Sequence, residues 1–265
     1  MTDTTTLPTP APPTPTPTPT PTRRDEAWRY ADIDALGRIG PEALENWREI
    51  AVEAGEARRQ CMIVGSQAPE LHRIRVTLGE GARLELFAAN AGSDYTRVEI
   101  EVTLASGAHF EFGGVTIGGG DVTREFVTTV RHDHPGATSN QTVRSVHWGG
   151  ATGNFLGEIK VARDAQKTDA AQDFKGLLLE AGASANAVPQ LEIFADDVKC
   201  AHGATVGELD EAARFYMAAR GISPELAQRL LVQAFIADAF VALQDEVEHT
   251  RLLDAALAAL EEAPR

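Results

Sequence analysis

Residues 97–104 read Arg-Val-Glu-Ile-Glu-Val-Thr-Leu, with an apolar side chain at every second position. In an extended strand this spacing places the apolar side chains on one face and the polar side chains on the other. Similar runs separated by Gly, Asn, Asp and Ser predict a mainly β core over residues 61–206. These runs lie at 73–78, 83–86, 108–112, 124–130, 141–146, 155–161, 176–179 and 191–194.

Many short strands with no helix between them are typical of a β-sandwich, a barrel or a β-solenoid. Gly-Ala pairs stand next to several runs, at 81–82, 107–108 and 136–137 among other places. Small residues suit tight corners, and the coils of a solenoid need such corners. The periodicity alone does not separate a solenoid from a sandwich.

Two segments precede the predicted core. Residues 1–22 are rich in alternating Pro and Thr. Since proline lacks a backbone donor and the segment has little apolar surface to bury, we expect an extended, disordered tail. Residues 23–60 are predicted to form an N-terminal helical region, with a break at Gly40-Pro41 and a further helix from Glu42 to Gln60.

The apolar spacing returns to 3.6 residues from Glu208 onward, which predicts a C-terminal helical domain over residues 207–265. A first helix from Glu208 to Arg220 is followed by Ser223-Pro224, a typical helix start. The next helix carries more apolar bulk than a lone surface helix needs, so it packs in a small bundle or binds a partner. Its apolar side chains include Leu226, Leu230, Leu231, Phe235 and Val241.

The composition argues against several classes of partner. The chain has 265 residues and a net charge of −15, whereas nucleic acids and anionic membranes attract clustered Lys and Arg. No stretch is long and apolar enough to span a bilayer, and the N-terminus lacks the apolar region of a secretory signal. Cys61 and Cys200 could form one disulfide, but two free thiols in a reducing cytoplasm are the favoured interpretation.

Two histidines suggest a metal site. His132 and His134 are separated by one residue, and positions i and i+2 share a face of a strand. Cupin metal sites use such a pair, so a cupin-like metal-binding enzyme is the alternative function. No acidic residue follows His134 within ten positions, which disfavours this alternative.

Cys200 and His202 form a second pair with the same spacing. Thiolate and imidazole both bind iron and zinc, and Lys199 together with a cationic His202 would lower the pKa of the thiol. Two ligands are too few for a closed site, so a metal or cluster here needs ligands from another chain. The alternative is a buried Cys and a corner His that only pack.

Nucleotide-binding motifs are absent from the sequence. It contains no GxxxxGK[ST] loop, and Gly118-Gly119-Gly120 lacks the spacing of a dinucleotide-binding turn. No nucleotide is therefore expected to bind this chain.

Residues 190–207, Gln-Leu-Glu-Ile-Phe-Ala-Asp-Asp-Val-Lys-Cys-Ala-His-Gly-Ala-Thr-Val-Gly, resemble the signature of the SufD family of the SUF iron–sulfur cluster assembly system. The resemblance extends in order over about residues 130–245, and Trp28-Arg-Tyr30 resembles the N-terminal block of the family. The chain is short for the family, and neither its Pro/Thr-rich tail nor Cys61 has a counterpart there. The other blocks are 154–159, 165–170, 177–179, 214–216 and 219–222.

The resemblance implies a right-handed parallel β-helix flanked by helical parts, which selects the solenoid. It also implies a non-enzymatic scaffold subunit that pairs with SufB, binds the ATPase SufC and takes part in iron entry and cluster assembly. Cys200 and His202 would hold iron or a transient cluster at the junction with SufB. Whether the isolated chain forms a homodimer stays open. The residues implied to contact SufC are Phe215, Tyr216, Arg220, Leu230, Leu231 and Phe235.

Overall fold

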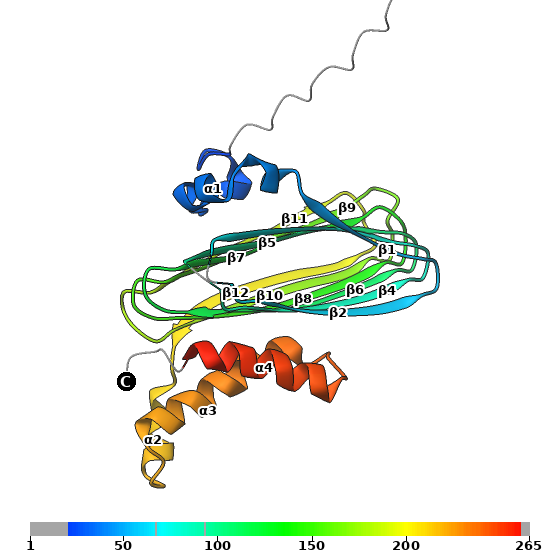
Figure 1. Cartoon of the computed structure of the whole chain (residues 1–265). Coiled ribbons are helices and arrows are strands. Elements are labelled where there is room, and N and C mark those ends of the chain that lie inside the picture. The colour runs from blue at the N-terminus through cyan, green and yellow to red at the C-terminus, as the bar shows by residue number, and fades with distance from the viewer. Residues whose placement is uncertain (1–20, 67, 93, 261–265) are drawn as a thin grey trace, which may run out of the picture.

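The computed structural model of the chain describes residues 21–66, 68–92 and 94–260, so residues 1–20 of the tail expected over residues 1–22 lie outside the described part. In the described part the chain winds into a solenoid whose strands alternate between two parallel sheets (Figure 1). The odd sheet has the order β1-β3-β5-β7-β9-β11, and the even sheet has the order β12-β10-β8-β6-β4-β2. The strands are β1 (Trp47–Val52), β2 (Ala57–Val64), β3 (Glu70–Leu78), β4 (Arg83–Asn90), β5 (Tyr95–Leu104), β6 (His109–Gly118), β7 (Thr123–His132), β8 (Thr138–His147), β9 (Thr152–Val161), β10 (Asp169–Leu178), β11 (Ser184–Ile193) and β12 (Lys199–Glu208).

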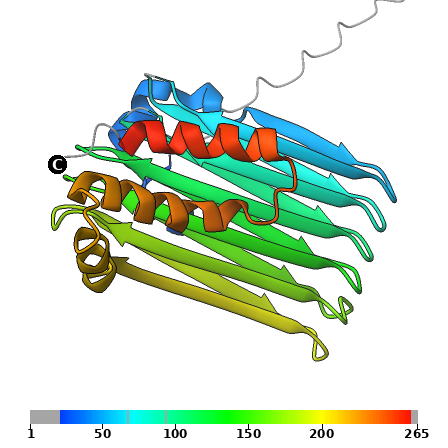
Figure 2. The ribbon, with the colours of Figure 1, turned by 90° about the horizontal axis from the view of Figure 1, so that it is seen from below.

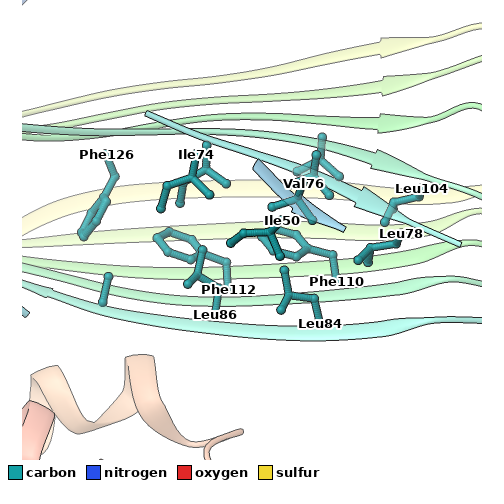
Figure 3. Close-up of a cluster of buried hydrophobic side chains, with 14 of the residues drawn as sticks. Ile50, Ile74, Val76, Leu78, Leu84, Leu86, Leu104, Phe110, Phe112 and Phe126 are labelled. Carbon is teal, nitrogen blue, oxygen red and sulfur yellow. The ribbon is translucent and has the colours of Figure 1, made fainter. Parts of the chain in front are cut away.

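The predicted parallel β-solenoid is confirmed, and its alternating runs account for the core. Val98, Ile100 and Val102 of β5 point between the sheets and are buried, as the period of two requires. Figure 3 shows apolar side chains of both sheets meeting in this layer, including Phe112 and Phe126, whose rings pack edge to face at 5.3 Å. Full burial of one such side chain contributes about 1.5–3 kcal/mol, so the stacked coils rest mainly on this layer.

The corners between coils use the predicted Gly-Ala pairs. Gly107 and Gly136 have φ angles of 66° and 72°, a region that residues with a side chain rarely adopt. The amide of Gly107 donates to the carbonyl of Pro135 in the next coil, which stacks one corner on the next. The alanines that follow the glycines, Ala108 and Ala137, are buried.

The prediction of a helix from Glu42 to Gln60 is wrong. A 3₁₀ turn, η2 (Pro41–Leu44), ends before β1, and β1 and β2 form the first coil of the solenoid. The Ala, Glu and Arg residues of this segment favour a helix locally. Pairing of β1 with β3 and burial of Ile50 and Val52 override that preference.

The remaining N-terminal elements cover the outer face of the odd sheet (Figure 1). They are η1 (Glu26–Trp28) and α1 (Ile33–Ile39). The guanidinium of Arg97 lies 3.8 Å from the centre of the Trp28 ring. Beneath them, buried Glu125 accepts hydrogen bonds of 2.9 Å from the hydroxyl of Tyr95 and from the amide of Asn154.

The C-terminal helices are α2 (Glu211–Ala218), α3 (Pro224–Ala237), η3 (Asp238–Phe240) and α4 (Glu246–Leu260). Of these, α3 and α4 form a hairpin that covers the outer face of the even sheet (Figure 2), whereas α2 packs on α3 and projects away from the sheet (Figure 1). Ser223 caps α3 as predicted, since its side chain accepts from the amide of Leu226. The helix expected from Glu208 is shorter, because β12 continues to that residue. No helix in the described ranges is long and apolar enough to cross a bilayer.

Candidate functional site

Cys200 and His202 lie on β12, the edge strand at the end of the solenoid. In the described part of the chain β12 pairs only with β10, where Cys200 is in register with Ala170 and His202 with Gln172. Ala170 and Gln172 are buried inside the solenoid. Because residues in register share a face of a sheet, Cys200 and His202 face the direction of the core, at the end where the described coils stop.

The two columns of inward-facing side chains become more polar toward this end. Leu86 and Phe112 of the even sheet are followed in register by Gln141, Gln172 and His202. The amide of Gln172 donates a hydrogen bond of 3.2 Å to the carbonyl of Gln190 in β11. Polar residues at inward-facing strand positions are a signal present in the sequence, but they become recognisable only once the register of the strands is known. In the second column, the residues leading to Cys200 are Leu84, Phe110, Ser139 and Ala170.

Cys200 is half-buried against a small apolar cluster that includes Ile159, Val161 and Ala170. Its pKa is raised, mainly because burial disfavours the thiolate and further because of the charge of Asp169. The lowering of this pKa that was expected from Lys199 and a cationic His202 is therefore wrong. Lys199 is adjacent to Cys200 in the strand and projects from the opposite face, in register with Asp169. At neutral pH the thiol is protonated, so metal binding must release a proton.

His202 is exposed, which leaves its imidazole accessible from the end of the solenoid. No group of three or more His, Cys, Asp or Glu side chains suited to a metal ion occurs among residues 21–66, 68–92 and 94–260. Cys200 and His202 thus supply at most two ligands from the described part of this chain. A tetrahedral site for iron or zinc needs four.

Exposed apolar side chains also occur at what we call the open end, the end of the solenoid formed by β11 and β12. Ile193, Phe194 and Val206 are 38%, 58% and 48% exposed, which is unusual for large apolar residues. Pro189 lies within β11 and lacks a backbone donor, a feature that suits an edge strand. The open end therefore presents two strand edges and the uncovered end of the apolar core.

His132 and His134 do not form a pair. His132 is the last residue of β7; it is buried, and its Nε2 lies 2.9 Å from the hydroxyl of Ser139. Burial lowers its pKa to about 4. His134 lies beyond the end of the strand and is exposed, because the chain turns at Pro135-Gly136. The strand face that would have brought the two imidazoles together is absent, and the parallel coil is unlike a cupin barrel.

The six residues predicted to contact a partner on the C-terminal helices fall into two groups. Phe215, Tyr216, Arg220 and Leu230 are exposed, and the guanidinium of Arg220 lies 3.4 Å from the centre of the Tyr216 ring. Leu231 and Phe235 are half-buried and line a cleft of about 320 Å³ together with Val206 and Leu209. Residues of α3 and of the edge strand β12 thus line the same cleft, which the sequence did not indicate.

Cys61 lies far from the open end, on β2 beneath α4. Burial and the neighbouring carboxylate of Glu248 raise its pKa to about 11. Neither Cys61 nor Cys200 is in a disulfide.

Comparison with known proteins places these features in a family. Residues 49–235, more than half of the chain, match the family model described as "SUF system FeS cluster assembly, SufBD core domain". The chain is 40% identical over 119 residues to the iron–sulfur cluster assembly protein SufD of Escherichia coli, covering 45% of this chain and 28% of that protein. It is 33% identical over 161 residues to a SufBD family iron–sulfur cluster assembly protein of Synechocystis, covering 60% and 36%.

A third relative is the SufD protein of Bacillus subtilis, with 33% identity over 123 residues that cover 46% of this chain and 28% of the relative. In all three comparisons the matched segment spans well under half of the relative's length. The likeness is confined to that segment.

Proposed function

The chain belongs to the SufBD family of SUF-system iron–sulfur cluster assembly proteins, and we propose that it is a non-enzymatic scaffold subunit of that system. It pairs with SufB through its open end, carries SufC on its C-terminal helices, and takes part in iron entry and the assembly of a nascent cluster. The ATP chemistry belongs to SufC. We place this assembly in the cytoplasm, in keeping with the two free thiols.

The observation that carries the proposal is the exposure of strand edges and apolar side chains at the open end. Unpaired strand edges and an uncovered apolar core are liabilities in a free protein, because they invite pairing with other chains. A partner solenoid would extend the sheets from β11 and β12 and bury Ile193, Phe194 and Val206. SufB is the partner proposed for this surface. In its absence a second copy of this chain would occupy the same end.

Iron or a nascent cluster is the cargo of the proposed site. The thiol of Cys200 and the imidazole of His202 lie on one strand face at this junction, so both can reach a metal shared with the partner. The partner would supply the remaining ligands, among them a cysteine of SufB. Loss of the thiol proton accompanies binding, which makes loading easier as the pH rises.

SufC would dock on the exposed apolar surface of α2 and α3. Phe215 and Tyr216 are 77% and 58% exposed, and aromatic side chains dominate the energetics of many interfaces. Leu231 and Phe235 of α3 line the same cleft as Val206 of the edge strand. Movement of the docked helices during ATP hydrolysis would reach the open end through this cleft and expose the shared site.

Co-expression with SufB and SufC tests the proposal. A tag on this chain should retrieve both proteins, and a chain that leaves both behind would contradict the assignment. Thiol crosslinking in the retrieved complex should then join Cys200 to a cysteine of SufB. Cys61, which lies on the first coil, provides the control: Cys61→Ser should keep the crosslink and Cys200→Ser should lose it.

A test of the cargo site uses the same complex. His202→Ala should lower the iron and sulfide carried by the retrieved complex, whereas His134→Ala, another exposed imidazole away from the open end, should not. Unchanged iron and sulfide in the His202→Ala complex would show that this residue only packs.

A further inference from the structure

The first coil of the solenoid, formed by β1 and β2, differs from the last coil in what faces the core. Arg48 is in register with Ile74, and Arg58 is in register with Leu84. Ile74 and Leu84 are buried core residues, whereas both arginines are exposed to solvent. The two arginines therefore continue the columns of inward-facing side chains. Because they belong to the first coil, at the end of the solenoid, their guanidinium groups are still exposed to solvent.

A hydrogen bond crosses this end of the core. Nη2 of Arg48, on the odd sheet, donates to Oε1 of Gln60, on the even sheet, at 3.1 Å. Gln60 is in register with Leu86, so it also stands in a core column. The first coil is thus covered by polar groups of its own, while the open end leaves Ile193 and Val206 uncovered.

We propose that Arg48 and Arg58 prevent a second solenoid from stacking on the first coil, so that assembly occurs through the open end alone. Head-to-tail stacking would continue the columns from one copy into the next. Following the register, Arg48 would then lie beside Pro189 of the neighbouring copy, and Arg58 would lie beside Cys200.

Such stacking would bury two guanidinium groups between the cores of the two copies. Neither Pro189 nor Cys200 is an acidic residue that could pair with either guanidinium group. Burying an unpaired charge is strongly unfavourable, and inward-pointing charges are a known protection of sheet ends against further pairing. Two first coils meeting each other would be opposed as well, because their arginines would come together as like charges.

The number of solenoid ends that can bind another copy determines whether the assembly is a pair or a filament. A solenoid with two receptive ends adds copies head to tail and grows into a filament, whereas one with a single receptive end stops at a pair. This function of the first coil goes beyond the proposed scaffold function and does not depend on the identity of the partner at the open end.

The test is the mass of the purified chain in solution, measured by light scattering behind a sizing column over a range of concentrations. The variant Arg48→Val, Arg58→Leu should form species of at least twice the mass of the parent chain, increasing with concentration. Circular dichroism of the variant should match the parent, since both side chains are exposed. A folded double variant that keeps the parent mass at every concentration would overturn the proposal.

Two further variants distinguish stacking on the first coil from nonspecific association through an added apolar side chain. Arg59→Leu makes the same exchange on the same strand, but Arg59 projects outward and pairs with Glu85 at 2.8 Å; this variant should keep the parent mass. Adding Gln60→Arg to the double variant restores an inward cation and should return the parent mass. Association of the Arg59→Leu variant as strong as that of the double variant, or failure of Gln60→Arg to reverse the growth, would count against the proposal.

Discussion

Nε of Arg144, in β8, donates a hydrogen bond of 2.9 Å to Oδ2 of Asp238, the first residue of η3. Arg144 is buried, and the same guanidinium also donates to the carbonyl of Asp173 and to its carboxylate. One side chain of the even sheet therefore holds the turn between α3 and α4. The contact between Arg144 and Asp238 thus links the helices proposed to bind SufC to the solenoid.

Removing this contact should loosen the helical hairpin while leaving the solenoid intact. Asp238→Ala should lower the free energy of unfolding by about 1 kcal/mol, because its carboxylate is half-exposed and Arg144 keeps Asp173. Hydrogen exchange should become faster in α3 and α4 and stay unchanged in β5. Lys175→Ala, which removes an exposed cation 3.8 Å from Asp238, is the control and should have little effect. Unaltered exchange in α3 and α4 of Asp238→Ala would show that the contact does not hold the hairpin.

Gly113 should be required for the close packing of η3, the turn between α3 and α4, against the even sheet. A Cβ atom at Gly113 would lie 2.0 Å from the carbonyl oxygen of Ala239 and 2.7 Å from the Phe87 ring, so Gly113→Ala must displace η3. Overpacking of this kind costs about 1–3 kcal/mol, which chemical denaturation would detect. Gly207→Ala is the matched strand control, since no atom lies within 4 Å of its added Cβ. Equal stability of the two variants would contradict the close approach of the helices.

Two buried histidines should make the fold sensitive to acid. Burial is the main cause of the lowered pKa of His147, about 3, and of His132, about 4, against 6.5 in the unfolded chain. Below pH 6.5 the unfolded chain binds more protons, so stability is full above this pH and declines toward pH 4. At pH 5 each histidine should account for a loss of about 2 kcal/mol.

Denaturation at pH 7.5 and at pH 5 would measure this loss. His132→Asn should remove about half of the loss between these two pH values, because His147 remains. His134→Gln, which changes an exposed imidazole, should leave the dependence as in the parent chain. A parent chain equally stable at both pH values would refute the assigned cause.

The strands were predictable where one face is buried, because alternation such as that of residues 97–104 is a local signal. The first coil was not, because β1 becomes a strand through pairing of Trp47 with Arg73, 26 positions away, against a helix-favouring composition. The candidate pair Cys200 and His202 was found from its spacing. The pKa of the thiol was misjudged, because both causes that raise it depend on the fold: burial of Cys200 is the larger, and the charge of Asp169, on the neighbouring strand, adds to it.

Removing that charge should make Cys200 more reactive. In a Cys61→Ser background, where Cys200 is the remaining thiol, Asp169→Asn should raise the rate of alkylation at pH 7.5 by roughly twofold, since the thiolate is the reacting form. Part of the pKa elevation should persist, because burial is its larger cause. Lys199→Gln is the control on the same strand, since Lys199 does not contribute to the raised pKa of the thiol. A slower reaction in Asp169→Asn would reverse the assigned sign.

The isolated chain should fail to hold a stable cluster. Cys200 and His202 are two ligands, and the described part of the chain offers no group of three. Anaerobic reconstitution with iron and sulfide should therefore yield far less than one cluster per chain, and exposure to air should remove it. A second copy at the open end could double the ligand set, so the decisive sample is Val206→Arg, whose inward charge blocks that end as Arg48 and Arg58 block the other. A full, air-resistant cluster on this variant would mean that a single chain completes the site and that no partner is needed.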